Sequence, residues 1–191
     1  MLVTDLCHFL DLPPETPGPA TRLAKHLGDV VRAATAGDAG IAWESALPCR
    51  RRPAHRACPG RIVVLLAETE APVRWQCSAC GDGGMIDNRK DSPFDLGRRA
   101  STPTGALNKI TIANEVAAAL RDLQLLDTNG ERLVFAIRTD QDRAVLAATD
   151  DDLEELIGAV AAEANREPNR RRERRLDAAL DALNDAAATG A

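Results

Sequence analysis

The stretch "WQCSACGDGG", residues 75–84, has two cysteines separated by two residues, and glycine follows the pair. Thiolates at this spacing can both reach one zinc ion at about 2.3 Å, and glycine suits the tight backbone turn beneath the metal. Structural zinc takes four protein ligands in a tetrahedron. Cys77 and Cys80 are therefore one half of a predicted zinc site, and the other half must come from elsewhere in the chain.

The second half of the site is predicted in "CRRRPAHRACPG", residues 49–60, where two alternatives exist. His55 and Cys58 have the same tight spacing as the first pair. Cys49 and Cys58 form a wider pair, which gives an all-thiolate site. The interval between Cys58 and the first pair lies within the range of about 15–20 residues that is typical of zinc ribbons. The spacing leaves the fourth ligand open between Cys49 and His55.

The residues between the two half-sites predict a β-hairpin. "RIVVLL", residues 61–66, is a short run of β-forming residues, and "VRWQC", residues 73–77, alternates apolar and polar side chains as a half-buried strand does. "GMI", residues 84–86, predicts a third short strand. A hairpin brings the two half-sites together, so we interpret the segment as zinc-ribbon-like.

Outside this segment, the hydrophobic periodicity predicts an α+β protein. Apolar residues from position 20 onward recur at helical spacing and predict one amphipathic helix that ends near residues 36–40, whereas residues 1–18 are expected to be irregular. Residues 87–106 are interpreted as a connector, in which only "PFDL", residues 93–96, is expected to anchor to the fold.

The last part of the chain predicts the element order β-α-β-β-α-α. Its strands are expected at "KITI", "RLVFAIRT" and "AVLAAT", and its last helix is expected to kink or stop at Pro168. The expected divisions of the chain are an N-terminal helical segment, a zinc-ribbon-like segment, and an α+β unit with a long C-terminal helix or helix pair, at residues 1–48, 49–97 and 107–191.

The composition and the N-terminus predict a cytoplasmic protein. No apolar run approaches the roughly 18 residues that span a bilayer, and the N-terminal stretch has Asp5 and Asp11 but no basic cluster, unlike a secretory signal. In the reducing cytoplasm, clustered cysteines indicate metal ligands rather than disulfides. Arginine and alanine are frequent and lysine is rare, a bias that is typical of high-GC bacterial coding.

The predicted zinc is expected to be structural, and the protein is not predicted to be an enzyme. Four protein ligands fill the tetrahedral shell and leave no position for a reacting water. The chain has three histidines, and it has neither a phosphate-cradling glycine loop nor a nucleophile-elbow pattern. A metal-dependent hydrolase or nuclease is therefore only the third hypothesis for the function.

Arg50, Arg51, Arg52 and Arg56 lie within the second half-site with no acidic residue among them. Two interpretations exist for this cluster. The arginines contact the phosphates of a nucleic acid, or they balance the negative charge of the zinc thiolates. The first interpretation makes a zinc-ribbon nucleic-acid-binding, regulatory protein the alternative function.

Leu176, Leu180 and Leu183 form one apolar stripe on the predicted C-terminal helix. Such a stripe is expected to be buried, either on the chain's own body or on a second copy of the chain. We expect it to pack on the chain itself, against residues 133–149 or against the preceding helix. Self-association through this helix is the other outcome.

Several motifs, taken together, resemble a group of uncharacterised high-GC bacterial proteins. They are "CRRRP", "WQCSACGDGG", "DSPFDL" and "AAEANREPNRRRERRLDAALDAL", and the resemblance extends from the first helix to the last. It implies no activity. In that group no histidine stands at the place of His55, which becomes the reserve fourth ligand. The resemblance therefore implies that the zinc ligands are Cys49, Cys58, Cys77 and Cys80.

These features together predict a non-enzymatic cytoplasmic accessory or interaction protein with a structural zinc site. The expected partner is another protein or a second copy of the chain. Nucleic acid is the alternative partner, and no membrane partner is expected.

Overall fold

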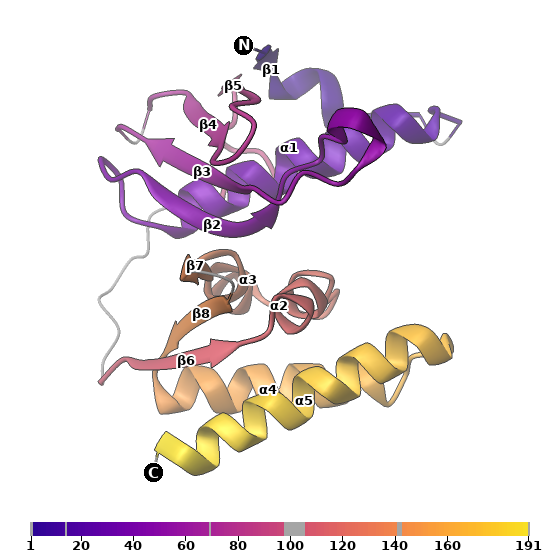
Figure 1. Ribbon diagram of the computed structural model, residues 1–191, viewed down its shortest axis with the longest axis vertical. Coiled ribbons are helices and arrows are strands. Elements are labelled where there is room, and N and C mark those ends of the chain that lie inside the picture. The colour runs from indigo at the N-terminus through magenta and orange to yellow at the C-terminus, as the bar shows by residue number, and fades with distance from the viewer. Residues whose placement is uncertain (1, 14, 69, 98–105, 141–142, 191) are drawn as a thin grey trace. The chain divides into compact units, whose positions relative to one another are not determined.

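The computed structural model describes residues 2–13, 15–68, 70–97, 106–140 and 143–190, which form a mixed α/β fold, as predicted (Figure 1). The chain divides into two compact units, Met1–Arg98 and Arg99–Ala191. No helix among the described residues has both the length and the apolar character that crossing a membrane requires.

The N-terminal unit contains a sheet that packs against helix α1 (Gly18–Ala36). Its strand order is β1-β5-β4-β3-β2, in which β1 is parallel to β5 and the other neighbours are antiparallel. The strands are β1 (Leu2–Asp5), β2 (Trp43–Pro48), β3 (Arg61–Leu66), β4 (Val73–Cys77) and β5 (Gly83–Asp87).

The apolar core of this unit lies between α1 and the sheet. Side chains along β3 and β4 alternate between buried and more exposed, and the fully buried Ile62 and Val73 belong to the face that packs on α1. Leu27, Val30 and Val31 of α1 are also fully buried. Burial of one such side chain contributes roughly 1.5–3 kcal/mol. The predicted helix, hairpin and third strand are confirmed, and the hairpin belongs to a larger sheet with its own core.

The expectation of an irregular N-terminus is wrong. β1 pairs with β5, and the 3-10 helix η1 (Leu6–Phe9) follows it with Leu6 fully buried. Gly84 permits this pairing, because a Cβ there would lie 2.2 Å from the Leu2 carbonyl oxygen. Parallel strands need a long crossover between them, so no local sequence pattern indicates the pair. The expected helical segment of residues 1–48 also contains the unpredicted strand β2.

The segment after β5 is anchored to the unit, as expected for "PFDL". Leu96 is buried, and its backbone N–H donates to Thr35 Oγ1 on α1 at 3.1 Å. A largely buried ion pair between Arg89 and Asp95, both within this segment, holds the segment in its fold.

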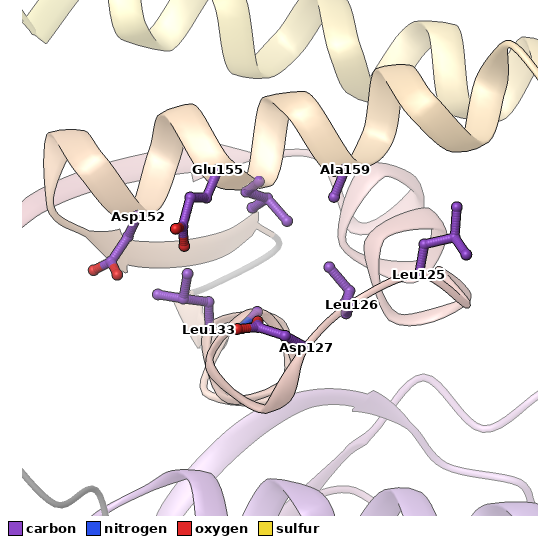
Figure 2. A pocket seen from close by; sticks show the side chains of 9 residues that line it. Leu125, Leu126, Asp127, Leu133, Asp152, Glu155 and Ala159 are labelled. Carbon is purple, nitrogen blue, oxygen red and sulfur yellow. The ribbon is translucent and has the colours of Figure 1, made fainter.

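The described part of the C-terminal unit combines an antiparallel sheet, in the order β7-β8-β6, with helices that pack on it and on one another. A small pocket lies between two of these helices, α3 and α4 (Figure 2). The elements are β6 (Asn108–Ile112), α2 (Asn114–Arg121), α3 (Thr128–Phe135), β7 (Arg138–Asp140), β8 (Arg143–Ala148), α4 (Asp150–Ala164) and α5 (Arg170–Gly190).

The strand predicted at residues 132–139 is wrong over its first half, which forms the end of helix α3. The side chain of Asp127 caps this helix by accepting the backbone N–H of Gly130 at 2.7 Å. Only Arg138 and the residues after it form β7, which pairs with β8 in the predicted hairpin. The element order is therefore β-α-α-β-β-α-α, with one helix more than predicted.

The C-terminal stripe packs on the chain itself, as predicted. Pro168 lies between α4 and α5, and Asn169 caps α5 by accepting backbone N–H groups of its first turn. Leu176 and Leu183 are buried, and α5 packs on α4 and α2. Leu180 is only half-buried.

Candidate metal centre

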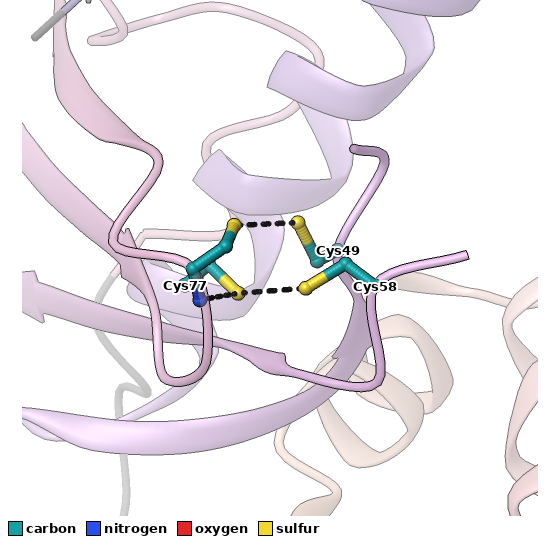
Figure 3. Close-up of side chains that lie close together, drawn as sticks. Cys49, Cys58 and Cys77 are labelled. Carbon is teal, nitrogen blue, oxygen red and sulfur yellow. Dashed lines mark hydrogen bonds between the residues drawn. The ribbon is translucent and has the colours of Figure 1, made fainter. Parts of the chain in front are cut away.

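Four cysteine sulfur atoms converge beside the strand ends of the N-terminal unit (Figure 3). The Sγ atoms of Cys49, Cys58, Cys77 and Cys80 all lie within 4.8 Å of one another. The Cys49–Cys80 distance is 3.8 Å and the Cys58–Cys77 distance is 3.7 Å. A tetrahedron with metal–sulfur bonds of about 2.3 Å has edges of about 3.8 Å. The cluster therefore has a size and a ligand set that could hold a metal ion.

Each cysteine of the cluster is placed by the end of a strand or by a turn. Cys49 directly follows β2, Cys58 lies shortly before β3, Cys77 ends β4, and Cys80 lies in the turn between β4 and β5. The Cys49 N–H donates to the Gly60 carbonyl oxygen at 3.0 Å and closes the loop between β2 and β3. Because β2, β3 and β4 are neighbours in the sheet, their pairing brings the four thiols together.

Two glycines allow the backbone to approach the sulfur atoms. A Cβ at Gly60 would lie 2.5 Å from Cys77 Sγ and 2.8 Å from the backbone nitrogen of Ala79. Gly81 has a φ of 69°, in the left-handed region that glycine adopts most easily. The sequence indicated the role of Gly81 but not that of Gly60, although a glycine soon after Cys58 is a signal of the same kind.

Backbone N–H groups donate to two of the sulfur atoms. Cys77 Sγ accepts from Ala79 at 3.4 Å and from Cys80 at 3.5 Å, and Cys49 Sγ accepts from Arg51 at 3.4 Å. Burial alone would raise the pKa of Cys77, but hydrogen bonds from these N–H groups and neighbouring thiols lower that pKa to about 7. Burial raises the pKa of Cys49 to about 12. Binding of a metal cation would thus have to displace protons from the cluster.

His55 and Cys7 lie outside the cluster. His55 belongs to the short 3-10 helix η2 (Pro53–His55), is exposed, and has a φ of 63°. Its ring is not among the groups that converge with the sulfur atoms. Cys7 is exposed, with its Sγ 3.9 Å from the Asn88 carbonyl oxygen. Of the two predicted ligand sets, the structure brings together the four cysteines and leaves His55 apart.

The four arginines of the predicted basic cluster are exposed on the loop between the first two cysteines. The Nε atom of Arg51 lies 3.3 Å from Asp82 Oδ2, which links this loop to the turn after β4. Within the described part of the chain, no carboxylate lies within ion-pair distance of Arg50, Arg52 or Arg56. The loop therefore presents three positive charges beside the sulfur cluster that no described carboxylate pairs with.

A half-buried histidine contacts the strand that carries Cys77. The His26 ring on α1 meets the Trp75 ring edge-on, with 5.6 Å between the ring centroids. Burial, together with the positive charge of Arg50, lowers the pKa of His26 to about 4. His26 is therefore neutral near pH 7. The sequence does not reveal this contact, because α1 and β4 are far apart along the chain.

No protein-family model, curated protein or solved structure matches this chain. The four-cysteine cluster is thus the feature from which a function can be inferred.

Proposed function

We propose that the protein is a non-enzymatic accessory or interaction protein of the cytoplasm, with a structural zinc ion in its N-terminal unit. The observation that carries this proposal is the pair of sulfur–sulfur distances, 3.8 and 3.7 Å, which match the edge of about 3.8 Å of a zinc–thiolate tetrahedron. The proposed ligands are Cys49, Cys58, Cys77 and Cys80.

A structural role is favoured by the number of ligands. Four thiolates fill every position of tetrahedral zinc, so no position stays open for a water or a substrate. Three of the cysteines are buried, and the ion would join the ends of β2 and β4, the start of β3 and the turn before β5. None of the described cysteines is in a disulfide, which leaves their sulfur atoms able to bind a metal ion, and a reducing cytoplasm maintains that state.

Native mass spectrometry of protein purified under reducing conditions tests the zinc ion. We expect one zinc per chain, and Cys80→Ser should lose it, because a structural site requires all four ligands. Cys7→Ser and His55→Ala are the matched controls and should keep the metal, since neither residue belongs to the cluster.

Two results would contradict this proposal. A folded wild-type protein that carries no metal would remove its basis, and metal loss on His55→Ala but not on Cys49→Ser would show a different ligand set. Tetrahedral thiolate sites also bind iron. Iron in place of zinc would keep the ligands and change the metal, and both the ion's mass and visible absorbance would reveal it.

A second candidate function, a zinc-ribbon nucleic-acid-binding protein, is favoured by the basic loop. Arg50, Arg52 and Arg56 are exposed and, within the described residues, face no carboxylate. Cys49 and Cys58 lie at the two ends of the loop that carries these arginines. Because both belong to the sulfur cluster, the backbone of the loop is restrained before any ligand binds. Arginines of this kind bind phosphates, and their binding weakens as the salt concentration rises.

Fluorescence anisotropy with duplex DNA, single-stranded DNA and RNA tests this second candidate. Replacement of the three arginines by glutamine should weaken binding. On duplex DNA, the slope of log K against the logarithm of the salt concentration should become less steep by about 0.9 for each phosphate contact that is lost. A charge-matched control replaces the exposed Arg166, Arg170 and Arg171 by glutamine. Absence of binding to all three nucleic acids at low salt would eliminate the candidate.

A further inference from the structure

A pocket of about 190 Å³ lies in the C-terminal unit between α4, α3 and the segment that joins α2 to α3 (Figure 2). Its apolar lining includes Leu126, Leu133, Leu156 and Ala159. Sites for small-molecule ligands usually measure roughly 300–1,000 Å³. The pocket therefore suits one long side chain rather than a cofactor.

Carboxylates line the same pocket, and one of them has no ion-pair partner among the described residues. Asp127 caps α3 by accepting the backbone N–H of Gly130. Asp152 accepts the backbone N–H of Thr149 at 3.2 Å in the cap of α4, and its other oxygen accepts the side-chain amide of Asn129 at 3.1 Å. Glu155 is exposed, and no described cation lies within ion-pair distance of it. Figure 2 shows its side chain pointing from α4 toward α3.

The charge of the whole unit favours a cationic occupant. Residues 1–98 contain as many acidic as basic residues, so the net charge of −5 lies entirely in residues 99–191. The first turn of α4 adds Asp150 and Asp151 beside the pocket's acids. A positively charged group is therefore attracted to this unit, and an anionic one is repelled.

We infer that this pocket anchors an arginine side chain of a protein partner. An arginine can lay its methylene groups on the leucines and direct its guanidinium to Glu155. The guanidinium group is more weakly hydrated than the lysine ammonium group. It therefore loses less hydration free energy when it enters a half-apolar pocket. Leu125, at the edge of the pocket, is 50% exposed and offers a contact for an apolar residue next to that arginine.

The carboxylates of the pocket are not arranged as a metal site. Among the described residues, the cysteine cluster is the only group of three or more potential ligands whose atoms lie close enough to share a metal ion. The occupant is thus expected to be an organic cation with apolar parts. This inference does not depend on the zinc ion, which concerns the other unit.

A peptide titration of the full-length protein tests the inference. The probe is acetyl-Leu-Arg-Leu-Arg-amide, added during ¹⁵N–¹H correlation spectroscopy, with the same peptide carrying citrulline in place of arginine as its uncharged, nearly isosteric control. We expect the largest shifts in residues 125–133 and 152–159, and a citrulline peptide that binds at least tenfold more weakly. Equal binding of the two peptides, or shifts centred outside these residues, would overturn the inference.

Matched variants separate the pocket from general charge effects. Glu155→Gln should weaken binding of the arginine peptide about fivefold, whereas Glu154→Gln, the neighbouring exposed acid outside the pocket lining, should leave binding unchanged. Ala159→Leu should fill the pocket and abolish binding while the spectrum shows that the fold persists. Equal effects of the two glutamine variants would contradict the inference, as would Mg²⁺ alone reproducing the peptide's shifts.

Discussion

Gly60 lies against Cys77, and a Cβ at position 60 would be 2.5 Å from the Cys77 sulfur. Real Cβ atoms do not approach other atoms so closely, so any side chain at this position must displace the loop or the sulfur. The cluster thus depends on a residue that binds no metal itself. A substitution at Gly60 therefore changes the shape of the cluster and leaves all four cysteines in place.

Gly60→Ala should destabilise the N-terminal unit by about 1–3 kcal/mol, the usual cost of overpacking, and should weaken zinc binding. Gly158→Ala is the matched control, because a Cβ at this position of α4 meets nothing within 4 Å. Alanine in a helix interior is favoured over glycine by about 0.5–1 kcal/mol, so the control should gain stability. Urea unfolding and zinc competition with a chelating dye measure both effects. An unchanged zinc affinity in Gly60→Ala would refute the prediction.

Metal removal by a chelator should loosen the N-terminal unit without unfolding the C-terminal one. Residues 49–60 and 77–83 should lose hydrogen-exchange protection, because the cluster holds both segments. Amides of α5 should keep their protection, since this helix packs on α4 and α2 in the other unit. Hydrogen exchange followed by mass spectrometry resolves the two units. Equal loss of protection in both would show that the metal supports the whole chain.

Acid should destabilise the protein through His26. Its pKa is about 4 in the folded protein, against an ordinary value of 6.5, so between these values the unfolded chain binds a proton that the folded chain does not. Stability is therefore lost as the pH falls through this window. This difference in pKa predicts that the free energy of unfolding decreases by about 2 kcal/mol between pH 7 and pH 5.

His26→Gln removes this contribution and serves as the comparison. Urea unfolding at pH 7 and pH 5 measures the free energy of unfolding of both proteins. Its decrease from pH 7 to pH 5 should be about 2 kcal/mol larger in the wild type than in the variant. Acid also displaces zinc from thiolates, but that effect is common to both proteins and cancels in the difference. Parallel losses in the two proteins would mean that His26 takes up its proton in the folded state as readily as in the unfolded chain.

Leu183→Ala should destabilise the C-terminal unit by about 2–5 kcal/mol, because the side chain is fully buried where α5 packs on the unit. Leu180→Ala should cost clearly less, since Leu180 is only half-buried. Thermal unfolding measures both effects, and sedimentation reports the oligomeric state. If Leu183→Ala left the stability intact and instead dissociated a dimer, the stripe would be an interface between copies.

The sequence by itself indicated three members of the cluster, Cys58, Cys77 and Cys80, and the hairpin between them. The spacing of the cysteines and the alternation of residues 73–77 are local patterns, which can be recognised in the sequence without knowing the fold. The sequence left the fourth member of the cluster open, because Cys49 and His55 lie on the same loop. The pairing of β2 with β3 brings Cys49 to the cluster, whereas the left-handed backbone at Ala54 and His55 leaves the histidine exposed.

Helix α3 shows a second limit of the sequence. The run Leu133–Phe135 is apolar at every position, and a short run of this kind suits a buried strand as well as a buried helix. The cap at Asp127 and packing on α2, α4 and β8 decide for the helix.

Only the tertiary structure decided the pairing of β1 with β5, the contact of His26 with Trp75, and the pocket beside Glu155. Each joins elements that are separated along the chain. Such contacts are stabilised by burial and by charges that come together only after folding. The sequence of either segment therefore shows no periodic pattern that would predict the contact.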